Sequence, residues 1–182
     1  MKIYFKIIYL IYIVSIGFFL VKRDIVSTGI SAFALIGILL IIRANKIYNK
    51  LFHNSLTVVL VLFITMSLVF GTCFNFYSIN HYDDFLHIWS GLIGCSIAYS
   101  MFVFFIGIEL DNKKKRFFFA LYLFMFSMGI ASIWELVEFG MDKFLPFNCQ
   151  AGGLEDTMID TFDCMIGSIV MTGYYFLKNK GR

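Results

Sequence analysis

Long apolar stretches alternate with short polar connections along almost the whole chain. Six such stretches stand out, each of 18 to 23 residues: 3–21, 25–42, 56–76, 84–106, 117–139 and 156–177. About 20 apolar residues in a helix are needed to cross the ~30 Å hydrocarbon core of a bilayer. The pattern therefore predicts six transmembrane helices. Because no repeat of fixed period and no low-complexity segment divides the chain, we expect one six-helix domain over residues 1–182.

The composition favours the same class. Hydrophobic residues make up 60% of the chain, which has 23 Phe, 10 Tyr and a single Pro, whereas charged residues make up only 15%. That charged fraction is too small to cover the surface of a soluble protein of this size. The first stretch lacks a small-residue cleavage site and is followed at once by the second, so we expect a retained helix and not a signal peptide. The expected fold class is an all-α polytopic membrane protein.

The basic residues are distributed unevenly between the two sides of the predicted membrane domain. Twelve of the 15 Lys and Arg residues fall on the side of both termini, whereas Lys22, Arg23 and Lys143 fall on the other. Because positively charged loops stay in the cytoplasm, we predict cytoplasmic termini for a multi-pass protein of the bacterial inner membrane. Nine of the twelve acids lie at or near the outer ends of the last three stretches. The candidate site is therefore expected at the extracytoplasmic face.

The outer ends of the last three predicted helices carry acids and a histidine at helical spacing. Neighbours within each set are three or four residues apart, so each set lies on one helix face. An ionisable side chain inside a membrane costs ~2.5 kcal/mol or more, which marks a functional site. With a rise of 1.5 Å per residue, His87, Glu135 and Asp160 are each expected about 5–6 Å inside their helix ends, at one depth. The full set is Asp83, His87, Glu135, Glu138, Asp156, Asp160 and Asp163.

So many carboxylates at one depth repel one another, so either several are protonated or a cation lies among them. A divalent metal cation is the simplest source of compensating charge. One imidazole among oxygen ligands fits Mg²⁺, Mn²⁺ or Ca²⁺, and a carboxylate-rich Zn²⁺ site or a two-metal site is also open. The expected catalytic residues are Asp83, His87, Glu135, Glu138, Asp156 and Asp160. The expected metal ligands are His87, Glu135, Glu138, Asp156, Asp160 and Asp163.

Simpler structural roles compete for some residues near the candidate site. Asp84 and Asp156 could each cap the N-terminus of a helix, which is a common use of aspartate. Gly91, Gly94 and Gly167 are expected to permit close packing between helices. Neither capping nor solvation accounts for Glu135, Glu138 and Asp160 at their expected depth.

The four cysteines do not form a recognisable framework. Cys73, Cys95, Cys149 and Cys164 show no Cys-x-x-Cys spacing and mostly fall in apolar stretches. We therefore expect them to be small buried hydrophobic residues. A Cys73–Cys149 disulfide near one face is an open alternative. No basic surface with interleaved aromatic residues indicates nucleic-acid binding.

Three motifs in residues 82–167 carry a resemblance to known membrane proteins. They read Tyr82-Asp83-…-His87-…-Gly91, Glu135-Leu-Val-Glu138-Phe139, and Asp156-Thr157-x-x-Asp160 followed by Gly167. In this pattern the chain resembles the YjdF-like family of bacterial inner-membrane proteins of unknown function, and more loosely the VanZ-like proteins. The resemblance implies that the acids and the histidine of these motifs are the family-type positions, whereas Asp84 departs from the family pattern. It supports the site and does not specify a reaction.

Three kinds of function are compatible with these residues. The first is a metal-dependent hydrolase or transferase that acts at the outer leaflet on a lipid or lipid-linked, phosphate-bearing substrate. The second is a proton- or cation-coupled transporter, which usually has its site near the midplane and polar access from both sides. The inner halves of the last three stretches (98–106, 117–128 and 165–177) contain no charged residue and no proline, which disfavours such a path. The third is a non-catalytic membrane component whose ion joins three helices.

Overall fold

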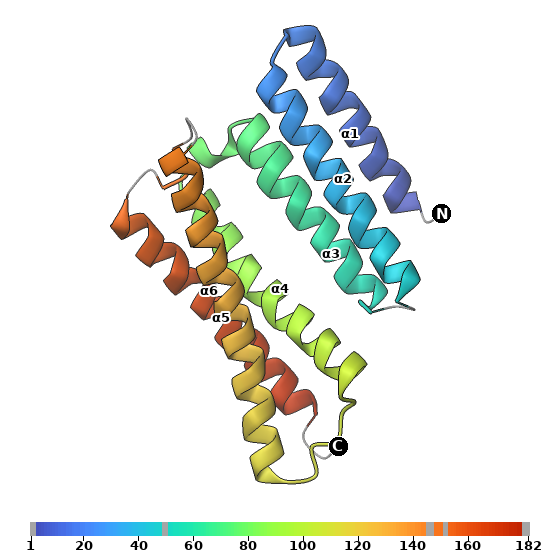
Figure 1. Ribbon diagram of the computed structural model, residues 1–182, viewed down its shortest axis with the longest axis vertical. Coiled ribbons are helices and arrows are strands. Elements are labelled where there is room, and N and C mark those ends of the chain that lie inside the picture. The colour runs from blue at the N-terminus through green and yellow to red at the C-terminus, as the bar shows by residue number, and fades with distance from the viewer. Residues whose placement is uncertain (1–2, 49–50, 145–147, 151–152, 180–182) are drawn as a thin grey trace. The chain divides into compact units, whose positions relative to one another are not determined.

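The computed structural model describes residues 3–48, 51–144, 148–150 and 153–179, and every regular element in those ranges is helical (Figure 1). The elements are α1 (Ile3–Lys22), α2 (Ile25–Ile47), α3 (Asn54–Ile64), the π-helix η1 (Thr65–Cys73), the 3-10 helix η2 (Phe76–Ser78), α4 (Tyr82–Phe105), α5 (Lys113–Phe144) and α6 (Leu154–Lys178). The predicted all-α class is confirmed for this part of the chain. The helices form two compact units, Met1–Tyr82 and Asp83–Arg182. A single six-helix domain stays a prediction.

Within the described ranges, five helical segments are long and apolar enough to cross a membrane: Phe5–Lys22, Ile25–Ile47, Asn54–Cys73, Tyr82–Phe105 and Lys113–Phe144. Large apolar side chains such as Val21, Ile25 and Phe33 are 86%, 84% and 71% exposed. Apolar surface of this kind needs lipid to cover it. The sixth helix, α6, has 25 residues, but the acids in its first half lower its hydropathy. The sixth crossing and the orientation of the termini stay predictions.

The first unit packs α1, α2, α3 and η1 around an apolar core. Tyr12, Ile38, Val61 and Val69 of this core are completely buried. The hydroxyl of Tyr12 lies 3.3 Å from Oγ1 of Thr65, so the polar end of the buried tyrosine is paired. The core thus joins the π-helix to α1 without leaving a polar group unsatisfied at this contact.

A tight reversal joins α1 to α2, and Asp24 sets the start of the second helix. Arg23 has a φ of 59° at the reversal. The carboxylate of Asp24 accepts hydrogen bonds from the backbone N–H (3.0 Å) and the hydroxyl (2.6 Å) of Ser27. These bonds lower the pKa of Asp24. The N-terminal cap satisfies a backbone amide that the first helical turn leaves without a partner.

The third predicted helix, 56–76, differs from the expected continuous α-helix. It is α-helical through Asn54–Ile64, becomes π-helical over Thr65–Cys73, and ends before the 3-10 turn Phe76–Ser78. Hydroxyl groups bond to backbone carbonyls in this region: Thr65 donates to Val61 at 2.8 Å. Such bonds compete with the regular helical pattern. An apolar run does not distinguish the two helical forms, which is why the sequence did not reveal the change.

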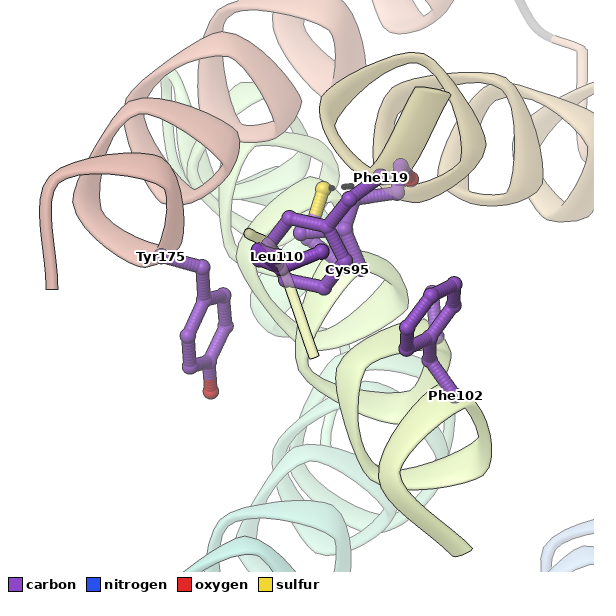
Figure 2. Close-up of a cluster of buried hydrophobic side chains, with 7 residues drawn as sticks. Cys95, Phe102, Leu110, Phe119 and Tyr175 are labelled. Atoms are coloured by element: carbon purple, nitrogen blue, oxygen red, sulfur yellow. Dashed lines mark hydrogen bonds between the residues drawn. The ribbon is translucent and has the colours of Figure 1, made fainter. Parts of the chain in front are cut away.

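The second unit consists of α4, α5 and α6. Its apolar core lies toward the end where α4 is followed by α5, and Figure 2 shows Cys95, Phe102, Leu110 and Phe119 grouped there. Phe119 is completely buried, and its ring meets that of Phe102 edge to face with centroids 5.1 Å apart. The thiol of Cys95 donates to the backbone carbonyl of Leu123 at 3.5 Å. Cys95 thus serves as the small buried residue that the sequence predicted.

Glycines bring α4 and α6 into direct backbone contact. A Cβ atom at Gly91 would collide with the carbonyl oxygen of Cys164, and one at Gly167 would collide with the carbonyl oxygen of Ile88. Only glycine permits this approach, and small residues serve the same purpose at many helix contacts in membranes. The predicted packing role of these two glycines is confirmed.

A short polar network connects all three helices next to the glycine contact. The hydroxyl of Ser127 on α5 donates to the carbonyl of Gly91 at 3.0 Å, and the hydroxyl of Ser168 on α6 donates to Ser127 at 2.8 Å. Gly94 makes room for Ser127, because a Cβ atom at that position would collide with the serine hydroxyl. Both serines are 1% exposed or less. The unit therefore has interhelical bonds that require no ion.

Two of the helices that carry site residues, α4 and α5, have boundaries different from those predicted. α4 begins at Tyr82 and not at residue 84, so Asp83 is helical. α5 continues to Phe144, beyond the predicted end at residue 139. Glu135 therefore lies roughly 13 Å from the end of α5 at 1.5 Å per residue, and the expected depth of 5–6 Å is wrong for this residue. The apolar run ends at 139, but the helix does not, because a polar segment can continue a helix outside the apolar layer.

Candidate metal centre

Five ionisable side chains from three helices converge in the second unit. α4 provides Asp83 and His87, α5 provides Glu135 and Glu138, and α6 provides Asp160. They form two overlapping groups, Asp83–His87–Asp160 and Glu135–Glu138–Asp160, and in each group the possible ligand atoms lie within 4.8 Å of one another. Asp160 belongs to both groups. The convergence that helical spacing predicted is therefore present for these five residues.

His87 lies between two carboxylates. Its Nε2 atom is 3.4 Å from Oδ1 of Asp83 and 3.7 Å from Oδ1 of Asp160. Charge-assisted hydrogen bonds are shorter, at ~2.7–2.9 Å. Two ligand atoms that each lie ~2.1 Å from one ion are separated by about 3.0–3.4 Å in octahedral or tetrahedral geometry. The spacing around Nε2 is therefore closer to that of ligands around a cation than to that of a tight ion pair.

The centre of the cluster is buried, and one edge is open. Asp160, Glu135 and His87 are 2%, 7% and 8% exposed, whereas the side chain of Asp83 is 37% exposed. In the part of the chain that the structure describes, Oε2 of Glu135 and Oδ2 of Asp160 have no hydrogen-bond partner. A buried charged oxygen without a partner is costly, by ~1–3 kcal/mol or more. These two oxygens need a cation or a proton.

The glycine contact explains how the cluster is positioned. His87 precedes Gly91 by one helical turn on α4, and Asp160 precedes Cys164 by one turn on α6. Residues four apart lie on one helix face. Because the two helices touch at Gly91 and Cys164, the same faces hold His87 and Asp160 close together one turn away. The close contact at Gly91 thus sets the distance between His87 and Asp160.

The segment after α5 is attached to the site by two residues that the sequence did not assign to it. The carboxylate of Asp142 accepts the backbone N–H groups of Cys149 (2.6 Å) and Gln150 (2.8 Å). The side-chain amide of Gln150 donates to the hydroxyl of Thr157 at 2.7 Å and reaches the backbone carbonyl of Glu135 at 3.5 Å. Contacts across an irregular connection leave no periodic signal. The clearest sign of this attachment in the sequence is Asp142, which lies on the same helix face as Glu135 and Glu138.

Within each unit the cysteines are free thiols. Cys73 and Cys149 belong to different units, so a disulfide between them stays an open alternative. Cys149 lies in the segment that Asp142 holds. Partial burial, together with the neighbouring Asp142 carboxylate, raises the pKa of the Cys149 thiol to about 11. Cys149 is therefore a thiol and not a thiolate at neutral pH.

Asp156 and Asp163 belong to neither group of possible ligands. Asp156 still interacts electrostatically with Glu135 and Asp160, which places it near the edge of the cluster. Metal ligation by Asp156 and Asp163 stays a prediction. Asp83, by contrast, joins a possible ligand group although we predicted only a catalytic role for it.

A cavity of about 710 Å³ lies at the other end of the second unit, where α4 is followed by α5. Its lining includes Phe102, Ile106, Leu110 and Lys114. His87 lies near the start of α4 and these residues lie at or after its end. The cavity is therefore separate from the ionisable cluster.

Apolar helices with exposed faces, together with the buried acid–histidine cluster, define a multi-pass helical membrane protein. The chain belongs to the family of predicted membrane proteins designated DUF2238, whose model matches residues 2–180. It is also 31% identical over 147 residues to a protein of Thermotoga maritima described as an uncharacterized protein, with 75% of this chain and 71% of the relative covered. No solved structure matches the chain. The family is compatible with the resemblance to YjdF-like proteins.

Proposed function

We propose that the cluster binds a divalent cation and that the protein uses it as a hydrolase or transferase acting on a lipid or lipid-linked substrate at the extracytoplasmic face of the bacterial inner membrane. The observation that carries the proposal is the pair of buried oxygens, on Glu135 and Asp160, that have no hydrogen-bond partner among the described residues. Both carboxylates belong to one group with Glu138. A cation between them would satisfy both oxygens at once.

The donor set fits such an ion. It offers one imidazole and four carboxylates, which suits Mg²⁺, Mn²⁺, Ca²⁺ or a carboxylate-rich Zn²⁺ site. Bound there, the ion would polarise a substrate oxygen and favour the ionisation of a water molecule. A carboxylate of the cluster that does not bind the ion could accept a proton. A substrate could approach from the exposed edge at Asp83. A cation would attract a substrate with a phosphate-bearing headgroup.

The test is metal content and turnover of the detergent-purified protein, in which no ion gradient exists. We expect bound metal in the wild type, and turnover of phosphatidic acid or a polyprenyl pyrophosphate in mixed micelles that stops when chelator is added. Glu135→Gln keeps the side-chain volume and removes the charge, so metal affinity and turnover should both fall at least ~100-fold. Glu155→Gln is the control, because Glu155 is exposed on α6 and should leave both unchanged.

The remaining outcomes separate the alternatives. Wild-type protein without bound metal would overturn the cation site. Bound metal with no turnover, combined with a Glu135→Gln protein that is already unstable without chelator, would show an ion with a structural role, because losing one ligand leaves the other buried carboxylates uncompensated. Bound metal with no turnover and a stable Glu135→Gln protein would contradict the proposed enzyme activity but agree with the cation site.

A further inference from the structure

We propose that the cluster holds two divalent cations, with Asp160 as the carboxylate that bridges them. This inference rests on the proposed cation site and specifies its composition. Asp160 is the one residue that the two ligand groups share, and it is 98% buried with Oδ2 lacking a hydrogen-bond partner in the described part of the chain. Its other oxygen, Oδ1, already lies 3.7 Å from Nε2 of His87. Oδ1 thus lies on the histidine side, and Oδ2 is without a partner that would compete with a second ion.

The two groups differ in the helices that supply them. One combines Asp83 and His87 of α4 with Asp160, and the other combines Glu135 and Glu138 of α5 with the same aspartate. Each group alone provides three ligand atoms within 4.8 Å of one another, which is enough to hold one ion with water completing its coordination. Metal pairs in hydrolytic enzymes are ~3.5–4 Å apart and often share a ligand. Asp160, which belongs to both groups and has two carboxylate oxygens, meets this requirement.

Charge balance also favours two ions over one. The cluster contains four carboxylates, Asp83, Glu135, Glu138 and Asp160. Among the described residues, their ion pairs run to His87, and no lysine or arginine forms one with them. With all four carboxylates ionised, one divalent ion would leave a net charge of −2 next to the buried Glu135 and Asp160, which is costly. Two divalent ions balance the four carboxylates while His87 stays a neutral ligand.

The two positions are chemically unequal. The α4 position includes an imidazole, which suits Mn²⁺ or Zn²⁺, whereas the α5 position has only carboxylate oxygens, which suit Mg²⁺ or Mn²⁺. Mn²⁺ fits both, so it is the appropriate probe. It also reports on the bridge, because two Mn²⁺ ions joined by a carboxylate give an exchange-coupled EPR signal that isolated ions lack.

The experiment titrates the metal-free, detergent-purified full chain with Mn²⁺ and records stoichiometry and EPR spectra. Wild type should bind two ions with a coupled signal. His87→Ala should bind one ion at the glutamate position, and Glu138→Gln one ion at the histidine position, both without coupling. Glu138 is only half-buried, so its variant tests the inference even where a change at His87 disturbs folding. The exposed control Glu155→Gln should match the wild type.

A single Mn²⁺ per wild-type chain would overturn the second ion and leave the proposed function intact. Two ions per wild-type chain without exchange coupling would overturn the bridge. No bound Mn²⁺ at all would remove the cation site itself, and the proposed function with it. The failure of this inference is thereby distinguishable from the failure of the proposed function.

Discussion

At the scale of single residues, the reactivity of Cys149 reports on the segment that follows α5. Its thiol pKa of about 11 is above the ~8.5 of a free cysteine, and only the thiolate reacts with alkylating reagents. We expect iodoacetamide to modify Cys149 slowly at pH 7.5, with the rate rising about tenfold per pH unit until the pH nears 11. Peptide mass mapping separates this site from the other cysteines.

Asp142→Asn is the matched variant for this measurement. It removes the second cause of the raised pKa, the neighbouring negative charge, and weakens the bonds that Asp142 accepts from Cys149 and Gln150. Both changes should make modification at pH 7.5 faster. A wild-type rate that levels off near pH 8.5 would show instead that Cys149 is solvated and that Asp142 does not hold this segment.

At the scale of the helices, the contact between α4 and α6 leads to a prediction about Gly167. Gly167→Ala should destabilise the second unit by ~1–3 kcal/mol or more, because the added methyl group meets the backbone carbonyl of Ile88 and not a movable side chain. The candidate metal centre should weaken with it, since His87 is next to Ile88 and Asp160 lies two turns before Gly167. Thermal unfolding in detergent and Mn²⁺ affinity measure the two effects.

Gly173→Ala on the same helix is the control, with the opposite expected sign. A Cβ atom at Gly173 would meet nothing within 4 Å, and alanine is ~1 kcal/mol more favourable than glycine inside a helix. Gly173→Ala should therefore be neutral or stabilising. If both variants behaved alike, the close approach of α4 and α6 would have no energetic importance.

The sequence predicted the helices well where apolar runs define them and less well where other forces act. Hydrophobic length located all six, because a helix in lipid needs an unbroken apolar run. It missed the π-helix Thr65–Cys73, because an apolar run does not distinguish π- from α-helix. It also missed the extension of α5 to Phe144, because the apolar run ends at residue 139. Within the site, helical spacing correctly grouped Asp83 with His87 and Glu135 with Glu138. Spacing along one helix could not show that Asp160 would meet both pairs, because that depends on how the helices cross.

At the scale of the whole molecule, the distribution of basic residues predicts the topology. With twelve of 15 Lys and Arg residues on the side of the termini, a reporter fused to the C-terminus should be cytoplasmic and one inserted after Lys143 should be external. Paired reporters active on opposite sides of the membrane make the measurement. A cytoplasmic signal from the insertion after Lys143 would reverse the orientation and place the metal centre at the inner leaflet.

The backbone contact between α4 and α6 also bears on how the second unit can move. Rocking motions open and close a binding site by parting the helices that line it. Parting α4 from α6 and α5 would break the backbone contacts at Gly91 and Gly167 and the hydrogen bond from Ser127 to the carbonyl of Gly91, and unpaired polar groups are costly in hydrocarbon. Side chains can rearrange to follow a moving partner, but two touching backbones cannot. We therefore expect α4 and α6 to behave as one rigid body, and any opening of the site to lie on the side of Asp83, whose side chain is 37% exposed.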